Sequence, residues 1–185
     1  MQDKTDFLPR FDVVIRLLKD IKAKTLLDLG CGSGALTLRI AQVIGAAEVY
    51  GVDIDDEALR IAEMRGIKTF KVDLSKEHIP LPDESIDIIT ALEVLEHLLN
   101  PDHMIKEAYR VLKKGGYFLV STPNLASWVN RIVMLLGYQP YNAEVSTEIL
   151  AGVLWRAYSF IKPSGHIRPF TLRALIELLG IMALK

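Results

Sequence analysis

The residues Leu26-Leu27-Asp28-Leu29-Gly30-Cys31-Gly32-Ser33-Gly34 decide the fold of this chain. A short apolar strand ends there in a turn that has glycine at every second position. Further along, Val49-Tyr50-Gly51-Val52-Asp53 forms a second strand, which ends in a carboxylate. Glycines let the chain reverse from strand to helix and let a ligand approach the backbone. The two segments therefore predict a nucleotide-type cofactor at the carboxyl ends of two adjacent parallel strands.

The glycine spacing and the charge of Asp28 indicate which cofactor fits. Dinucleotide sites use G-x-G-x-x-G and place a pyrophosphate over a helix N-terminus. Here the glycines are Gly30, Gly32 and Gly34, and Asp28 adds a negative charge that would repel a pyrophosphate. S-adenosylmethionine has no phosphate and carries an ammonium and a sulfonium, so a carboxylate favours it. The alternative for Asp28 is a helix cap or a solvated charge.

Two further strand ends carry carboxylates. Asp53 is placed to accept hydrogen bonds from both ribose hydroxyls, a bidentate role that suits a carboxylate. The alternative is that Asp53 caps the next helix, although Asp55 or Asp56 would serve that end better. Phe70-Lys71-Val72-Asp73 is a third strand that ends in an acid. Three successive acidic strand ends indicate one shared binding edge.

With these residues the chain resembles the class I S-adenosylmethionine-dependent methyltransferases, in particular the small-molecule, ubiquinone-type O-methyltransferases. DLGCGSG and GVDID look like the first two family motifs and VDL, at residues 72–74, like the adenine-side motif. SIDIITALEVLEHL and RVLKKGGYFLVSTPN look like the fourth and fifth strands with their helices. The resemblance runs from about residue 7 to the end of the chain. It implies S-adenosyl-L-methionine as the cofactor, bound by Asp28, Leu29, Gly30, Cys31, Gly32, Gly34, Asp53, Ile54, Asp73, Leu74 and Glu93.

The order of apolar segments predicts an α/β fold, a Rossmann-like doubly wound sheet of mostly parallel strands with helices on both faces. Strands are expected at 25–29, 47–53, 67–72, 85–91 and 116–122, and helices at 9–20, 34–44, 56–65 and 101–112. Turns are expected at Asp83-Glu84 and at residues 113–116. A last amphipathic helix, 171–180, is expected to stop at Gly180. Because the family sheet continues with a sixth and a seventh strand, the C-terminal strands look truncated at Lys185, which leaves a bare sheet edge.

We expect one domain over residues 1–185, with an apolar and aromatic insertion at residues 123–168. Next to a cofactor site, such an insertion is interpreted as a lid over the acceptor, and the alternative is a helical pair that extends the core. Its apolar residues also suit a lipid-linked acceptor, a membrane surface or a homo-oligomer, which the bare sheet edge could form as well. Its apolar runs are too short to predict a transmembrane segment.

Composition agrees with a soluble enzyme. The net charge is −1, and no block of basic residues gives a strong nucleic-acid signal. Cys31 is the single cysteine, so no disulfide framework is expected, and its place in the turn favours a small spacer over a nucleophile. No signal peptide is apparent, so a cytoplasmic location is the default.

The pattern Glu93-x-x-Glu96-His97 suggests an additional function at the fourth strand end. If a helix begins near Glu93, these three side chains share one face. Together with His166 from beyond the insertion, they could bind a divalent ion, and the pattern is similar to that of Mg²⁺-assisted O-methyltransferases. Alternatively, Glu93 contacts the cofactor and His97 or His166 is a metal-free general base. The other two histidines, at positions 78 and 103, look like surface residues.

The resulting prediction is a methyltransferase that acts on a small-molecule or lipid- or sugar-linked acceptor, most simply a hydroxyl. The Asn/Asp-Pro-Pro-Tyr/Phe motif of amino-methylating DNA enzymes is replaced here by Thr90-Ala91-Leu92-Glu93, and carboxyl or amine acceptors stay open. Two alternatives remain. One is a noncatalytic cofactor-binding partner protein, and the other is an NAD-dependent oxidoreductase, which Asp28 and the glycine spacing disfavour.

Overall fold

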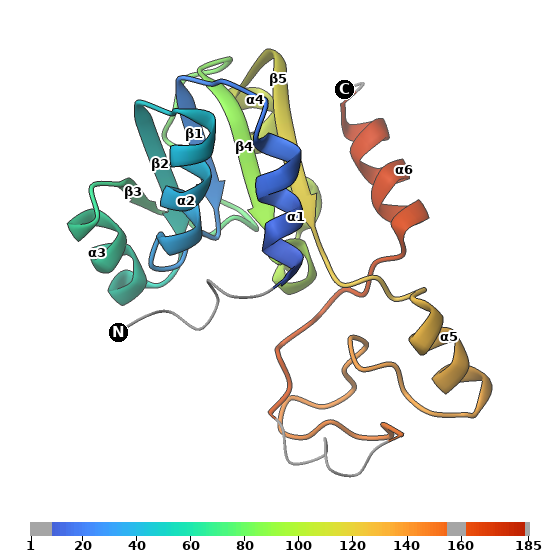
Figure 1. Cartoon of the computed structure of the whole chain (residues 1–185). Helices are drawn as coiled ribbons and strands as arrows, with labels where there is room; N and C mark the ends of the chain where they lie inside the picture. Colours follow the sequence, from blue (N-terminus) through green and yellow to red (C-terminus); the bar gives the residue numbers. More distant parts are fainter. Residues whose placement is uncertain (1–8, 155–161, 184–185) are drawn as a thin grey trace.

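The computed structural model describes residues 9–154 and 162–183 and shows an α/β fold (Figure 1). Its elements are α1 (Pro9–Leu18), β1 (Thr25–Leu29), α2 (Ala35–Ile44), β2 (Glu48–Asp53), α3 (Asp56–Met64), β3 (Lys68–Lys71), β4 (Ile86–Leu92), the 3-10 helix η2 (Leu95–His97), α4 (Pro101–Val111), β5 (Leu112–Ser121), α5 (Trp128–Leu135) and α6 (Leu172–Met182). The five strands form one sheet in the order β3-β2-β1-β4-β5, and every pairing is parallel. The predicted fold class is confirmed.

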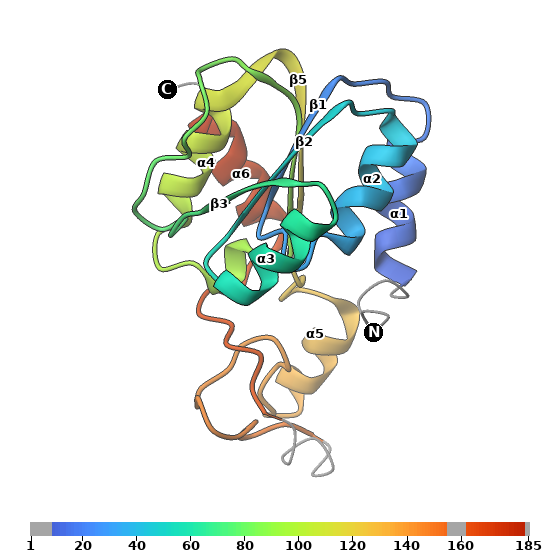
Figure 2. The ribbon, with the colours of Figure 1, turned by 90° about the vertical axis from the view of Figure 1, so that its left-hand side faces the viewer.

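The apolar strand β1 lies at the centre of the sheet because its side chains are buried on both faces. Leu27 and Leu29 pack into a core with residues of α4 and α6, whereas Leu26 packs into a second core with α1 and α2. In Figure 2, α1 and α2 lie on one side of the sheet and α4 and α6 on the other. The sheet is therefore covered on both faces, as predicted for a doubly wound fold.

Two expected element ends differ from the structure. The turn expected at 113–116 belongs to β5, whose first part is irregular, with a register shift against β4 between Ile86 and Ile88. The helix expected to stop at Gly180 continues to Met182. The predicted stop was therefore wrong, and so was the expectation that a sixth strand begins directly after Gly180. The reason is tertiary packing, because Leu179 and Met182 lie on either side of Gly180 and both contact the core.

The insertion leaves the sheet beyond the carboxyl end of β5 and returns before α6 (Figure 1). Its base is closed by a parallel bridge between Asn124 and Phe170, where the Leu125 amide donates to the Phe170 carbonyl at 2.7 Å. Residues 155–161 of the predicted insertion lie outside the described part. Within that part no helix is long and apolar enough to cross a membrane. The insertion thus enters and leaves the sheet layer at one point.

Candidate cofactor and acceptor site

The glycine turn after β1 forms the floor of the candidate site. Gly32 has a φ of 52°, and a Cβ added there would meet no atom within 4 Å, so its open side is available to a ligand. Gly34 also has a positive φ, of 79°, but a Cβ there would collide with the side chain of Ile67. Leu29 is fully buried in the core. Gly34 and Leu29 therefore shape the turn from behind and do not line its cavities.

Asp28 lies beneath the turn with only 5% of its surface exposed. Its two carboxylate oxygens accept hydrogen bonds from Thr37 Oγ1 at 2.5 Å and from Thr90 Oγ1 at 2.6 Å. Burial raises the pKa of Asp28 to about 6, although the two threonine hydroxyls counteract that rise. The side chain still lines the smaller cavity of the site. A positively charged ligand there would compensate the buried carboxylate.

Asp53 ends β2 and is held in place by backbone amides. Its Oδ2 accepts from Gly32 N at 2.7 Å, and its Oδ1 accepts from Ile54 N at 2.7 Å and Asp55 N at 3.1 Å. Asp55 caps α3 by accepting from the amides of residues 57 and 58, so the alternative role of Asp53 as that cap was wrong. The carboxylate of Asp53 is thereby fixed at the edge of the cavity.

Two cavities meet at Gly30 and Glu93, which line both of them. The smaller, of about 260 Å³, is lined by Asp28, Cys31 and Gly32 among others. The larger, of about 550 Å³, is lined by these residues: Gly30, Asp53, Ile54, Val72, Asp73, Leu74, Ser75, Glu93, Val94, His97, Leu98, Leu99 and Ile167. Acidic residues therefore line both parts of this space, and the larger part is flanked by the ends of β2 and β3.

Cys31 separates two glycines of the turn and is 8% exposed. Its Sγ lies 2.7 Å from the position that a Cβ on Gly51 would occupy, so the thiol fills the gap that this glycine leaves. Burial, followed by the charges of Asp28 and Asp53, raises the pKa of the thiol to about 12. The side chain stays protonated at neutral pH, in agreement with a spacer.

Glu93 follows β4 with a φ of 59°, a left-handed conformation that is uncommon for a residue with a side chain. Its amide donates to the Ser121 carbonyl at 2.9 Å, and its Oε1 accepts from Ser121 Oγ at 2.8 Å. The helix expected to begin near Glu93 was wrong, because η2 begins only at Leu95. Glu93 therefore does not share a helical turn with Glu96 and His97, although Glu93 and His97 line the same cavity.

The structure brings together three of the four predicted metal-ligating residues. One ligand atom from each of Glu96, His97 and His166 lies within 4.8 Å of the other two, whereas Glu93 is not in this group. The amides of Ile167 and Arg168 donate to the Glu96 carbonyl at 2.7 and 3.1 Å, which places His166 beside η2. Three of the four residues that the sequence pattern named therefore lie together, and whether they bind an ion stays a prediction.

The Glu96 carboxylate is the unusual group of this cluster. Glu96 is 1% exposed, and neither carboxylate oxygen makes a hydrogen bond within the described residues. Burial raises its pKa above the ordinary value for glutamate. Since a buried carboxylate needs a partner, the cluster offers either a proton-holding group or the start of a cation site.

Glu144 is a site residue that sequence reasoning missed. Its carboxylate accepts backbone hydrogen bonds from Ser164 N at 2.7 Å, Gly165 N at 2.8 Å and His166 N at 3.1 Å. It thereby closes one wall of a cavity of about 700 Å³ that includes His166 and Ile167. No sequence signal pointed to it, because its partners lie twenty or more residues away. Thr90 was missed for the same reason, since it lies 62 residues from Asp28, and Thr37 was missed although only nine residues separate it from Asp28.

Residues 27–120, more than half of the chain, match the family model described as a methyltransferase domain. The chain belongs to the class I S-adenosylmethionine-dependent methyltransferases. Among curated relatives of this methyltransferase, a ubiquinone biosynthesis O-methyltransferase of Hydrogenovibrio crunogenus is 33% identical over 115 residues, covering 60% of this chain and 47% of that protein. A ubiquinone biosynthesis O-methyltransferase of Idiomarina loihiensis is 32% identical over 165 residues, covering 84% and 63%.

The fold of this methyltransferase also has close counterparts among solved structures. An S-adenosylmethionine-dependent methyltransferase from Mesorhizobium loti superposes with a TM-score of 0.68 over 96% of this chain and 81% of that chain, at 19% identity. The methyltransferase spans about half the length of the first curated relative. The family assignment contradicts the NAD-dependent oxidoreductase alternative.

Proposed function

We propose that this methyltransferase transfers a methyl group from S-adenosylmethionine to a hydroxyl of a small-molecule or lipid- or sugar-linked acceptor. The observation that carries the proposal is one continuous sheet edge. On it, the two cavities that meet at Gly30 lie next to the cluster of Glu96, His97 and His166. A cofactor that fills the cavities would therefore end close to groups able to hold or remove a proton.

The residues at the two cavities suit the two ends of this cofactor. The buried Asp28 and the open face of Gly32 suit the cationic methionine end. Asp53 suits the ribose hydroxyls, and Asp73 with Leu74 the adenine. Glu93 lies at the junction of the two cavities, where the methyl group would face the acceptor.

The sulfonium supplies an already activated methyl group, so the protein mainly has to align the acceptor with it. Such alignment can contribute roughly 7–11 kcal/mol to lowering the barrier. His97 and His166 lie with ring centroids 5.0 Å apart beside the larger cavity and are the candidate general bases for a hydroxyl acceptor. General-base assistance adds about 10²–10⁴-fold to the rate.

In a more specific form of this proposal, a divalent ion such as Mg²⁺ takes part in the transfer. The unpaired carboxylate of Glu96 and the imidazoles of His97 and His166 would hold it, with Glu93 outside the ligand set. The ion would bind the acceptor hydroxyl and lower its pKa. Without an ion, the same histidines act as the base, and the two forms predict opposite effects of chelation.

The insertion supports a lid that encloses the acceptor. Its cavity, beside His166, opens between residues 144–148 and 163–167. α5 exposes a group of large apolar side chains: Trp128, Ile132, Met134 and Leu135. This apolar surface supports a lipid-linked acceptor, and the name of the ubiquinone O-methyltransferase relatives supports a hydroxyl.

The first test is calorimetric titration with S-adenosylhomocysteine, with NAD in a parallel cell. We expect micromolar binding of the adenosyl ligand and none of NAD. The second test follows transfer of a labelled methyl group from S-adenosylmethionine to catechol, phenol and a long-chain alcohol. Binding without transfer to any hydroxyl, carboxyl or amine compound would favour the noncatalytic cofactor-binding protein instead.

The metal form is tested by titrating Mg²⁺ alone into the protein and into His166→Ala. We expect binding that the substitution weakens at least tenfold, and transfer that a chelator abolishes and Mg²⁺ restores. If transfer is unaffected by the chelator but falls in His166→Ala with a changed pH profile, the histidine is a general base and the metal form is wrong.

A further inference from the structure

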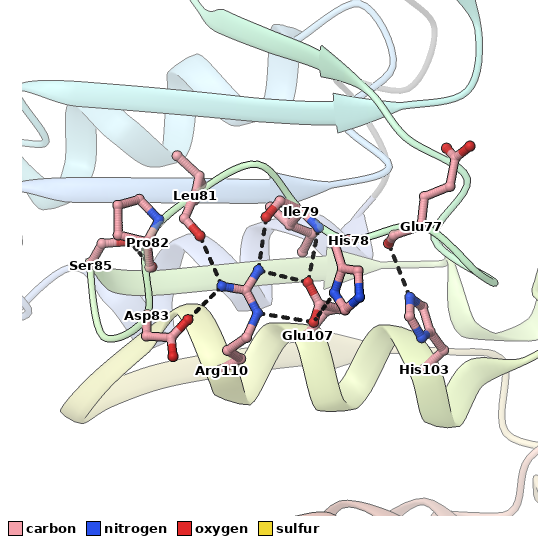
Figure 3. Close-up of polar contacts among 10 residues, drawn as sticks. All are labelled: Glu77, His78, Ile79, Leu81, Pro82, Asp83, Ser85, His103, Glu107 and Arg110. Carbon is pink, nitrogen blue, oxygen red and sulfur yellow. Dashed lines mark hydrogen bonds and ion pairs between the residues drawn. The ribbon is translucent and has the colours of Figure 1, made fainter.

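The guanidinium of Arg110, in the last turn of α4, has all five of its N–H donors paired (Figure 3). Nε and Nη2 donate to the two oxygens of Glu107 at 3.0 and 2.7 Å. The remaining donors reach the Ile79 carbonyl at 2.8 Å, the Leu81 carbonyl at 2.9 Å and the Asp83 carboxylate at 2.7 Å. A lysine ammonium has fewer donors on a single atom and cannot reproduce this planar arrangement.

Glu107 is the buried centre of the same network. It is 4% exposed and also accepts from Ile79 N at 2.9 Å and contacts His78 Nδ1 at 3.0 Å. Burial alone would raise its pKa, but the hydrogen bonds from Arg110, Ile79 and His78 lower it to about 2. A charged pair on α4 therefore holds the segment 78–83 by its backbone.

This segment continues directly into the adenine side of the candidate site. Residues 72–75 line the larger cavity. Within the turn that they begin, Glu77 N donates to the Asp73 carbonyl at 2.9 Å, and Glu77 Oε2 accepts from Asp73 N at 2.7 Å. His78 is the one residue between this turn and Ile79, which the pair on α4 holds. A shift of Ile79 would therefore be passed to Asp73 over a short, hydrogen-bonded stretch.

We infer that Glu107 and Arg110 are positioning residues for the adenine end of the cofactor, an inference that rests on the proposed function. Neither residue lines the cavities. They act through residues 72–85, which contain no helix or strand and connect β3 to β4. Because α4 holds this connection, the Asp73 carboxylate keeps a fixed position in the wall of the cavity. From that position it can distinguish an amino from an oxo group on the purine.

The test compares S-adenosylhomocysteine with S-inosylhomocysteine, in which an oxo group replaces the exocyclic amine. Calorimetry on the whole chain gives both dissociation constants for the unaltered protein, Arg110→Lys and Glu107→Gln. We expect the unaltered protein to prefer the amino ligand at least tenfold and both variants to lose most of that preference. Because the readout is a ratio, a smaller folded fraction in a variant does not imitate this result.

Asp87→Asn is the matched control. Asp87 is also a hydrogen-bonded carboxylate, which accepts from Lys24 N and Thr25 N at 2.9 Å and from Lys113 Nζ at 2.7 Å, but it lies at the amino end of β4, away from the cofactor edge. We expect it to lower stability and leave the ligand ratio unchanged.

An unchanged ratio in Arg110→Lys and Glu107→Gln, or an equal fall in Asp87→Asn, would overturn the inference. If the unaltered protein binds no S-adenosylhomocysteine, the proposed function itself fails. That outcome is distinct from binding that shows no preference between the two purines, which overturns only the positioning role.

Discussion

At the scale of single residues, Asp53 provides the sharpest test of cofactor binding. Asp53→Ala removes a carboxylate that backbone amides fix at the cavity edge. Two lost hydrogen bonds to a charged group, at about 1.5–3 kcal/mol each, predict a loss of about 100-fold or more in S-adenosylhomocysteine affinity. Asp55→Ala is the matched control, because it removes the cap of α3 and lowers stability by about 1 kcal/mol. Calorimetry in which Asp55→Ala weakens binding equally would contradict the assigned role.

The buried carboxylate of Asp28 is expected to lower the stability of the folded chain at neutral pH and to strengthen cofactor binding. Its pKa of about 6 in the folded chain, against 3.8 ordinarily, means that the folded state holds this proton more tightly than the unfolded state. The contribution of Asp28 to stability therefore falls as pH rises from about 4 to 6, by about 3 kcal/mol. We expect Asp28→Asn to raise the urea midpoint at pH 7, have little effect at pH 4 and weaken S-adenosylhomocysteine binding.

The exposed Asp20 provides the comparison for this experiment, since 86% of its side chain is accessible. Asp20→Asn should leave the urea midpoint unchanged at both pH values. A lower midpoint for Asp28→Asn at pH 7 would show that the negative charge, rather than its burial, stabilises the turn.

At the scale of elements, the insertion depends on Glu144 to hold the returning segment that carries His166. Glu144→Gln removes the charge that three backbone amides share, at residues 164–166. We expect hydrogen exchange of these amides to accelerate about tenfold or more, while S-adenosylhomocysteine affinity stays unchanged. Glu148→Gln, on the exposed side of the same cavity, is the control. Equal exchange rates in the protein and in Glu144→Gln would mean that other contacts hold this wall.

Most elements could be predicted because each follows from a local pattern. β1 is a short, mostly apolar run, and α3 begins after the aspartate that caps it. The errors occur where a distant contact decides the backbone. Glu93 takes a left-handed conformation and is hydrogen-bonded to Ser121 on β5. The helix α6 continues past Gly180 because Met182 contacts the core. Neither contact is visible in the neighbouring sequence.

At the scale of the whole molecule, three hydrogen-bonded carboxylates of opposite behaviour predict a pH profile of stability. Burial alone would raise the pKa of Asp87 and of Glu107, but their hydrogen bonds lower each to about 2. Their stabilisation is complete above their ordinary values and is lost as pH falls from about 4.5 to 2. Asp28 acts in the opposite sense between about 4 and 6. We therefore expect urea unfolding to show a maximum of stability near pH 4–5.

Two variants distinguish the loss of stability at acidic pH from the decline of stability above the maximum. Glu107→Gln should flatten the acidic limb, and Asp28→Asn should flatten the decline above the maximum. A stability that rises steadily to pH 7 in the unaltered protein would show that Asp28 does not titrate with a raised pKa.

The cofactor side of the candidate site could be predicted because each of its parts lies on one short segment. The cofactor side comes from residues 28–34, 53–54 and 73–74, each a strand end with its own motif. By contrast, the cluster of His166 with Glu96 is built by an insertion that returns over a long distance, and the network of Arg110 joins residues 27–31 positions apart. The sequence suggested the residues of this cluster but not the contacts that bring them together, and it gave no sign of the network of Arg110.

The bridge between Asn124 and Phe170 brings the two ends of the insertion together. Its two ends meet at one hydrogen-bonded rung, and the amides of Ile167 and Arg168 tie its returning end to the Glu96 carbonyl beside η2. The residues that line the two cavities of the candidate site lie upstream of the rung, apart from Ile167. Replacement of the loop between these two contacts is therefore the engineering route that this architecture offers, and we expect a grafted chimera to keep its affinity for S-adenosylhomocysteine while its proposed acceptor changes.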